Sequence, residues 1–263
     1  MDFVPSLPTL IAFTIAILLL AVTPGLDFDP IRGRQRLRFS YARATADIVE
    51  GLARLRPLNA FDRWRYRRWE HRVLRQPTEL VAVSAHDAEL IAQISGRPVN
   101  VVVNGVDCDF YQQVQPALHS QRLLFVGNFE YGANLEAIEW ALDDIMPKVW
   151  MSNPAVRLAI AGHAMPANWK LHWNDPRIEW FGYRPDLREL QRRSALFFAP
   201  LRYAGGSKVK ILEAMAAGLP VITTDKGVSG LTVNNGEHYL GSDDGDQLAL
   251  LITQLLNQPW RMS

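Results

Sequence analysis

The chain has 263 residues, of which 48% are hydrophobic and 21% charged, and its formal net charge is +1. This length suits one large or two modest domains, and the near-neutral charge gives no bulk electrostatic attraction for a nucleic acid or another polyanion. The single cysteine, Cys108, excludes an internal disulfide framework and suits a reducing compartment.

The first segment is an uncharged apolar stretch. No charged residue lies between Asp2 and Asp27, and residues 5–22 reach about 18 residues, the lower limit for a helix that crosses a bilayer. Arginines at 32, 34, 36 and 38 follow, and by the positive-inside tendency they would keep the C-terminal side in the cytoplasm. We therefore predict an apolar helix at residues 1–26 that attaches a cytoplasmic protein to the inner face of the plasma membrane. A buried apolar helix is the alternative.

Part of this segment has a resemblance of its own. The runs Ser6-Leu-Pro-Thr-Leu-Ile-Ala-Phe13 and Leu20-Ala-Val-Thr-Pro-Gly25 resemble the first helix of the lysine-exporter family of amino-acid exporters. That family has several membrane spans, and nothing after residue 26 supplies another. The resemblance therefore implies an anchor rather than transport.

Residues 27–118 are predicted to form a small α/β region. Residues 39–75 have a helical pattern rich in tryptophan, tyrosine and arginine. Strands are predicted at 79–84 and 99–103, with a helix over 87–94 between them and Ser84 as its N-cap. Asn104 to Asp107 predicts a turn, and Tyr111 to Gln121 is interpreted as an interdomain linker.

From residue 119 to 263, strands and helices alternate. Strands are predicted at 123–126, 156–161, 178–181, 196–199 and 221–224, and helices at 134–146, 187–194, 209–217 and 247–256. Asp186 and either Asp243 or Asp244 are candidate N-caps. Near-continuous apolar strands alternating with helices predict a doubly wound parallel sheet of the Rossmann-like type.

Three turns at the ends of these strands contain glycine, namely Gly127-Asn128, Gly162-His163 and Gly205-Gly206-Ser207. In such sheets ligands bind at the carboxyl ends of strands and at helix N-termini. The third turn opens a helix whose free N–H groups suit a diphosphate, and Lys208 and Lys210 add positive charge beside it. Glu213, further along this helix, can accept hydrogen bonds from ribose hydroxyls. A solvated position without a ligand contact is the alternative for both lysines.

The run Lys210-Ile-Leu-Glu-Ala-Met-Ala-Ala-Gly-Leu-Pro-Val221 resembles the signature helix of the retaining family 4 glycosyltransferases, which fold as two facing Rossmann-like domains. The segments 124–128, 182–186 and 227–231 have the order and spacing of that family. Residues 83–84 and 103–107 match the end of its N-terminal domain. The resemblance runs from about Trp64 to Leu256. It implies a GT-B-type C-terminal domain at 119–263 and a partial N-terminal domain at 27–118.

The resemblance also implies a function. A sugar would move from a nucleoside-diphosphate sugar to a glycan or lipid-linked acceptor, in bacterial envelope or exopolysaccharide synthesis, with no metal and no other cofactor. The implied donor-binding residues are Gly127, Asn128, Gly205, Gly206, Ser207, Lys208, Lys210 and Glu213, of which Glu213 would hold the ribose and the others would surround the diphosphate. The motifs identify no catalytic residue.

The sequence departs from the family pattern in two respects. Gly205 occupies the position of the first of the family's paired glutamates, and Asn128 stands where many members have an arginine. Much of the acceptor domain is also not recognisable, so we expect weak or absent sugar transfer by this chain. The alternatives are a catalytically inactive nucleotide-sugar-binding remnant and a membrane-anchored, transport-related protein.

Overall fold

The computed structural model describes residues 27–28, 35–36, 68–69, 71–203 and 208–257. The chain forms two compact units, residues 1–43 and 44–263. In the first unit, strands β1 (Asp27–Phe28) and β2 (Gln35–Arg36) pair antiparallel. The predicted apolar helix at 1–26 and most of the helical pattern at 39–75 lie outside the described residues, although 68–69 and 71–73 are helical. In the described part of the chain, no helix is both long and apolar enough to cross a membrane.

Residues 81–101 form a small β–α–β element. Strand β3 (Val81–Ala82) pairs in parallel with β4 (Asn100–Val101), and helix α4 (Ala85–Ser95) connects them. The predicted N-cap is confirmed, because Ser84 Oγ accepts a hydrogen bond from the Asp87 N–H at 3.1 Å. The helix ends at Gly96, whose φ of 68° lies in the left-handed region that glycine adopts without steric cost.

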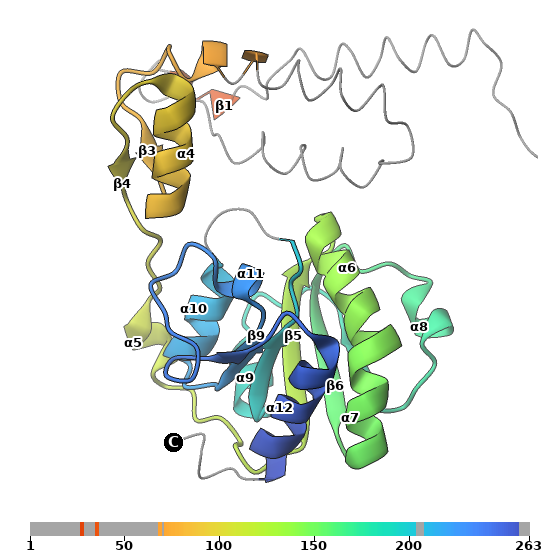
Figure 1. The fold of residues 1–263 in the computed structure, drawn as a ribbon. Coiled ribbons are helices and arrows are strands. Elements are labelled where there is room, and N and C mark those ends of the chain that lie inside the picture. The colour runs from red at the N-terminus through yellow and green to blue at the C-terminus, as the bar shows by residue number, and fades with distance from the viewer. Residues whose placement is uncertain (1–26, 29–34, 37–67, 70, 204–207, 258–263) are drawn as a thin grey trace, which may run out of the picture. The chain divides into compact units, whose positions relative to one another are not determined.

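A six-stranded parallel sheet forms the centre of residues 122–241 (Figure 1). Its strands are β5 (Arg122–Asn128), β6 (Arg157–His163), β7 (Ile178–Phe181), β8 (Leu196–Ala199), β9 (Val221–Thr223) and β10 (Leu240–Gly241). In space they follow the order β10-β9-β8-β5-β6-β7. The chain thus builds outward from β5 to β7, returns to the other side of β5 with β8, and continues outward to β10. This arrangement confirms the predicted doubly wound sheet, with its reversal of order between β5 and β8.

Helices cover both faces of the sheet (Figure 1). On one face, α6 (Gly132–Trp140), the π-helical turn η1 (Ala141–Ile145) and α7 (Met146–Ser152) form one continuous run, against which α12 (Gly245–Asn257) packs. The opposite face carries α9 (Arg188–Arg192) and α10 (Val209–Ala216). Three short helices lie outside these layers, α5 (Cys108–Tyr111), α8 (Trp169–His172) and α11 (Asp225–Val228).

The helix predicted to end at residue 146 continues to Ser152. Pro147 lacks an N–H group and would normally interrupt a helix. Just before it, the Met146 N–H bonds to the Ala141 carbonyl five residues back, and this π turn accommodates the proline within the run. The sequence prediction of a helix over 134–146 was therefore too short at its C-terminal end.

The apolar strands supply the core. Leu123, Leu124 and Phe125 of β5 have no exposed surface, and Phe197 and Phe198 of β8 are almost completely buried. Burying each such side chain stabilises the fold by roughly 1.5–3 kcal/mol. Because β5 and β8 are buried in this core, the turns at their carboxyl ends start from a rigid frame.

The interpretation of residues 111–121 as a linker is wrong at its start. Tyr111 ends helix α5, which Asp107 caps by accepting a hydrogen bond from the Phe110 N–H at 3.0 Å. Helix α5 packs against α10. Helices α8 and α11 and strand β10 were also not predicted. Each has only two to four residues, which is too short for a periodic pattern of hydrophobic residues.

Candidate functional site

The reversal of strand order places the candidate site at the carboxyl ends of β5 and β8. In open α/β sheets the loops on either side of such a reversal leave in opposite directions, and a crevice for ligands opens between them. Here β5 ends in Gly127-Asn128, and the chain after β8 leads into helix α10. Every donor-binding residue expected from the sequence lies on one of these two segments.

Lys208 occupies the N-cap position of helix α10. Among the residues that the structure describes, no side chain accepts a hydrogen bond from the first turn of this helix. The first N–H groups of a helix have no partner within it and form the positive end of the helix dipole, so this start suits an anionic group. Gly205, Gly206 and Ser207 lie outside the described residues, and their predicted contact with a diphosphate stays a prediction.

Lys208 is buried rather than solvated. The residue is only 6% exposed. Its Nζ lies 3.5 Å from Ser229 Oγ, in the segment after α11. The solvated alternative for Lys208 is therefore wrong. The fold keeps this positive charge at the start of α10, beside the helix N–H groups.

Lys210 bridges the two segments of the crevice. Its ammonium donates hydrogen bonds to the Val126 carbonyl at 3.0 Å and to Asn134 Oδ1 at 2.8 Å, and it lies 4.4 Å from the centre of the Phe125 ring. Burial, with a smaller contribution from Lys208, lowers the pKa of Lys210 to about 7. In this arrangement Lys210 holds α10 against the end of β5, while its contact with a diphosphate stays a prediction.

We expect the stability of the protein to depend on the protonation of Lys210. In the unfolded chain this lysine titrates near 10.5, so between about pH 7 and pH 10.5 the unfolded state holds a proton that the folded state lacks. The contribution of Lys210 to the free energy of unfolding should therefore rise with pH in this window, by up to about 1.4 kcal/mol per pH unit. Urea unfolding of the wild type and of Lys210→Met at a series of pH values measures the effect. The wild type should gain stability relative to the variant as pH rises, and a constant difference would contradict the prediction.

Asn134, at the start of α6, is a site residue that the sequence analysis missed. Its Nδ2 donates to the Asn128 carbonyl at 2.7 Å, while its Oδ1 accepts from Lys210. The same packing explains why position 127 is a glycine, since a Cβ there would lie 2.9 Å from Asn134 Cγ. Asn134 and Lys210 are 76 residues apart, so no local pattern in the sequence indicates that they meet.

A polar rim follows the ends of β5, β6 and β7. The Asn128 side chain accepts from the Glu130 N–H and donates to the Glu130 carboxylate, both at 3.1 Å. Glu130 Oε1 lies 3.9 Å from His163 Nε2, and His163 meets Tyr183 edge to face with 6.3 Å between ring centres. These side chains present hydrogen-bonding groups and include no lysine or arginine. Asn128 therefore does not replace the arginine of the family pattern as a source of charge.

Glu213 lies one turn beyond Lys210 on α10. Burial raises the pKa of its carboxyl group, and a hydrogen bond from the Tyr111 side chain acts in the opposite direction. Tyr111 is the last residue of α5 and the first residue of the stretch that was interpreted as a linker. The structure thus brings Lys208, Lys210 and Glu213 together on one helix and joins this helix to the turn at Gly127-Asn128 through Asn134.

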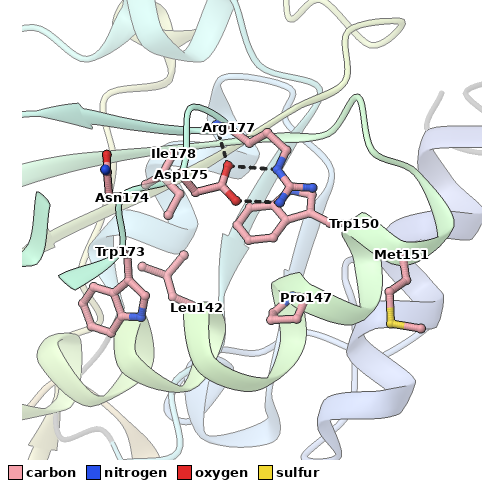
Figure 2. Close-up of a pocket in the computed structure, with 9 residues that line it drawn as sticks. All are labelled: Leu142, Pro147, Trp150, Met151, Trp173, Asn174, Asp175, Arg177 and Ile178. Atoms are coloured by element: carbon pink, nitrogen blue, oxygen red, sulfur yellow. Dashed lines mark hydrogen bonds and ion pairs between the residues drawn. The ribbon is translucent and has the colours of Figure 1, made fainter. Parts of the chain in front are cut away.

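The pocket drawn in Figure 2 lies elsewhere, at the amino end of β7. It has a volume of about 430 Å³ and is lined by residues of η1, α7 and the segment 173–178. Arg177 forms one wall by binding the Asp175 carboxylate and stacking 4.2 Å from the centre of a Trp150 ring. Because ligands of such sheets bind at the carboxyl ends of the strands, we assign this pocket to packing. Among the described residues, no group of three or more His, Cys, Asp or Glu side chains is placed to hold a metal ion.

Comparisons with known proteins agree with this geometry. Residues 120–258 match the family described as Glycosyl transferases group 1. A protein of Klebsiella pneumoniae described as an uncharacterized 44.6 kDa protein in the cps region is 30% identical over 135 residues, which cover 48% of this chain and 35% of that protein. Glycogen synthase of Mycobacterium tuberculosis is 26% identical over 201 residues, which cover 71% of this chain and 47% of that protein. The chain thus spans less than half the length of these two relatives.

Two solved structures have the same fold. HepE from Anabaena, in complex with UDP and glucose, matches with a TM-score of 0.62 at 17% identity, over 75% of this chain and 58% of that chain. WaaG, a glycosyltransferase involved in lipopolysaccharide biosynthesis, matches with a TM-score of 0.55 at 20% identity, over 70% of this chain and 55% of that chain. These matches confirm the predicted α/β fold of the GT-B type. None of the four proteins is described as an exporter, and the resemblance of residues 1–26 to an exporter helix stays a prediction.

Proposed function

The chain belongs to the Glycosyl transferases group 1 family, and from this membership we propose that it binds a nucleoside-diphosphate sugar at the carboxyl edge of its six-stranded sheet and transfers the sugar to an acceptor. One observation carries the proposal. At the reversal of strand order, a single helix, α10, has two lysines at its start and a partly buried glutamate one turn further on.

The diphosphate and the ribose of a nucleoside diphosphate each have a matching group on α10 or at its N-cap. The diphosphate would face the free N–H groups at the helix start and Lys208, where the charge and the helix dipole both favour an anion. Glu213 lies five residues further, about 7.5 Å along the helix axis. Its ionised carboxylate can only accept hydrogen bonds, and the two ribose hydroxyl groups can both donate to it. The spacing thus corresponds to phosphates and ribose of one nucleotide.

The proposed reaction is a glycosyl transfer. The bond between the anomeric carbon of the sugar and the diphosphate oxygen breaks, and the nucleoside diphosphate leaves with the electron pair. The acceptor hydroxyl oxygen forms the new bond to that carbon, and its proton passes to the leaving diphosphate. Negative charge grows on the diphosphate as the bond breaks, so the N–H groups and lysines of α10 would stabilise the transition state more than the bound substrate. The family resemblance implies retention of configuration.

The proposed product is a bacterial envelope or exopolysaccharide glycan. The Klebsiella relative is described as a protein of the cps region, and the description of WaaG names lipopolysaccharide biosynthesis. HepE was crystallised with UDP and glucose, which makes UDP-sugars the first donors to test. A growing glycan or a lipid-linked sugar would supply the acceptor hydroxyl.

We expect one nucleoside diphosphate and its sugar conjugates to stabilise the full chain. Thermal unfolding with UDP, GDP, ADP and their common sugar conjugates tests this, since a ligand at about 100 times its Kd stabilises the folded state by about 2.7 kcal/mol. The stabilising conjugate, carrying a labelled sugar, is then incubated with isolated envelope glycans. Because much of the acceptor domain is not recognisable in the sequence, we expect at most weak labelling of the glycan, accompanied by release of the nucleoside diphosphate. Stabilisation without labelling would favour a protein that binds nucleotide sugars without transferring them. Cooperative unfolding that no nucleotide shifts would refute the donor site.

We also propose that residues 5–22 attach the chain to the inner face of the plasma membrane. The uncharged stretch between Asp2 and Asp27 and the arginines that follow support this proposal. Cell fractionation of the full chain and of a variant that lacks residues 1–26 is the test. The full chain should sediment with membranes and the variant should not, and an identical distribution of the two would contradict the attachment.

A further inference from the structure

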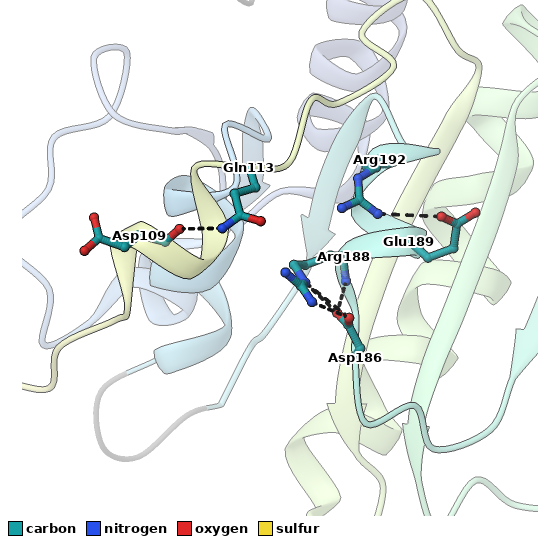
Figure 3. A network of polar contacts seen from close by, with 6 residues as sticks. All are labelled: Asp109, Gln113, Asp186, Arg188, Glu189 and Arg192. Carbon is teal, nitrogen blue, oxygen red and sulfur yellow. Dashed lines mark hydrogen bonds and ion pairs between the residues drawn. The ribbon is translucent and has the colours of Figure 1, made fainter.

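Two arginines at the carboxyl edge of the sheet have a carboxylate partner. Arg188, at the start of α9, is held by Asp186, with Nε 3.0 Å from Oδ1 and a terminal nitrogen 2.8 Å from Oδ2 (Figure 3). Arg202, just after β8, forms an ion pair with Glu136 of α6. In each pair the carboxylate offsets the positive charge of the arginine, which weakens its attraction for an anionic ligand.

Lys210 is bound differently, by neutral groups. Its ammonium donates to the Val126 carbonyl at 3.0 Å and to Asn134 Oδ1 at 2.8 Å, and it lies 4.4 Å from the centre of the Phe125 ring. Among the residues that the structure describes, no carboxylate forms an ion pair with it. The charge of Lys210 is therefore balanced by dipoles and an aromatic ring, and it can still attract an anion.

The side-chain amide of Asn134 joins Lys210 to the Gly127-Asn128 turn. Oδ1 accepts a hydrogen bond from Lys210, and Nδ2 donates to the Asn128 carbonyl at 2.7 Å. An ammonium can only donate and a carbonyl can only accept, so the opposite orientation of the amide would lose both bonds. An aspartate here could not donate to the carbonyl, and a leucine could make neither bond. The two contacts together thus require an amide at position 134.

The packing around Asn134 fixes this arrangement. A Cβ at position 127 would lie 2.9 Å from Asn134 Cγ and 3.0 Å from the Phe125 ring, so the glycine allows the amide to lie directly against the turn. The Asn134 N–H also donates to the Tyr131 carbonyl at 3.0 Å, which ties the start of α6 to the loop after β5. The turn, the start of α6 and the Lys210 ammonium therefore form one unit.

We propose that Asn134 is a positioning residue of the donor site, whose side-chain amide holds the Lys210 ammonium and the Gly127-Asn128 turn in the arrangement that receives the diphosphate. Groups that are held in place before a ligand arrives lower the entropy cost of binding it. This inference rests on the proposed function, because it requires a diphosphate at the ends of β5 and β8. A purely structural role, in which Asn134 only attaches α6 to α10, is the competing explanation.

The first test is calorimetric titration of the full-length wild type and Asn134→Leu. The ligands are inorganic pyrophosphate and whichever of UDP, GDP and ADP binds the wild type most tightly. Asn134→Leu should weaken both by roughly 3- to 10-fold, because binding must then order the lysine and the turn. Asn174→Leu is the matched control, since Asn174 is exposed before β7, at the opposite edge of the sheet, and this variant should bind both ligands as the wild type does.

The pH dependence of nucleoside diphosphate binding separates positioning from a structural role. As pH rises above the pKa of Lys210, the ammonium loses its proton and the affinity for an anion should fall along an alkaline limb. Asn134→Leu removes an acceptor of the ammonium and should move this limb to lower pH. Asn134→Asp places a negative charge there and should move it to higher pH. The charge of Lys208, which also acts on Lys210, is present in both variants, and the contacts from β5 are neutral.

Two controls accompany this comparison. In Lys210→Met the alkaline limb should disappear, because the group that titrates is gone, whereas the titration of the ligand itself is common to all the proteins. Urea unfolding shows that each variant is folded. Aspartate has the shape of asparagine, so the shift to higher pH can be measured even if leucine disturbs the packing against Gly127.

The outcomes are distinct. An unchanged affinity in Asn134→Leu, or limbs that stay in place or move in the same direction in the two variants, would overturn the positioning role while leaving the donor site intact. A limb that persists in Lys210→Met would also overturn it. A wild type that binds none of UDP, GDP and ADP would refute the proposed function, and the role of Asn134 would be refuted with it.

Discussion

Replacing Glu213 with alanine should weaken the binding of the nucleoside diphosphate by roughly 10- to 100-fold. A hydrogen bond to a charged group contributes about 1.5–3 kcal/mol, and each 1.4 kcal/mol corresponds to a tenfold change in Kd. The variant would lose the carboxylate that is proposed to accept hydrogen bonds from both ribose hydroxyls.

Calorimetric titration of the full chain measures this difference. Glu139→Ala is the matched control, since Glu139 is an exposed glutamate within helix α6 and its replacement leaves α10 untouched. Inorganic pyrophosphate should bind Glu213→Ala and the wild type equally, because it has no ribose. If Glu213→Ala bound the ribonucleotide as tightly as Glu139→Ala, the ribose would have to lie elsewhere on the edge of the sheet.

Replacing Gly162 with alanine should lower the free energy of unfolding by about 3 kcal/mol or more. The φ of Gly162 is 154°, a conformation that residues with a side chain rarely adopt. A Cβ at this position would also lie 1.7 Å from the Gly127 carbonyl oxygen, which belongs to the neighbouring strand. Backbone atoms cannot move aside as a flexible side chain would, so β5 and β6 would have to separate at their carboxyl ends.

Urea unfolding of the two alanine variants Gly162→Ala and Gly132→Ala provides the comparison. Gly132 begins α6 with a negative φ, and nothing lies within 4 Å of the position that its Cβ would occupy. Alanine at such a position usually stabilises a protein by about 0.4–1 kcal/mol. A similar stability for both variants would show that the contact between Gly127 and Gly162 is looser than the structure indicates. A large loss confined to Gly162→Ala would support a close approach of β5 and β6 beside the site.

The elements of the sheet domain could be predicted because their signals are local. β7 and β8 have the predicted limits, 178–181 and 196–199, since each is a short apolar run between polar turns. The cap at Ser84 was also readable, because a serine side chain and the N–H three residues later are neighbours in sequence. The capping of α12 by Asp244, which accepts from the Gln247 N–H at 2.9 Å, follows the same rule. Local hydrogen bonds and hydrophobic runs need no knowledge of the strand order.

The site was only partly predictable, because its contacts join segments that are far apart in the chain. The sequence by itself determined that Lys208, Lys210 and Glu213 follow a glycine-containing turn within and just before one helix. Only the tertiary structure decided that Lys210 reaches Val126 and Asn134, and that α5 packs against α10. The physical reason is the order of the strands. An apolar run specifies a buried strand but not its neighbours in the sheet. The packing of all six strands and their helices decides that β8 lies beside β5. Because β8 and β5 are adjacent, helix α10 lies at the end of β5.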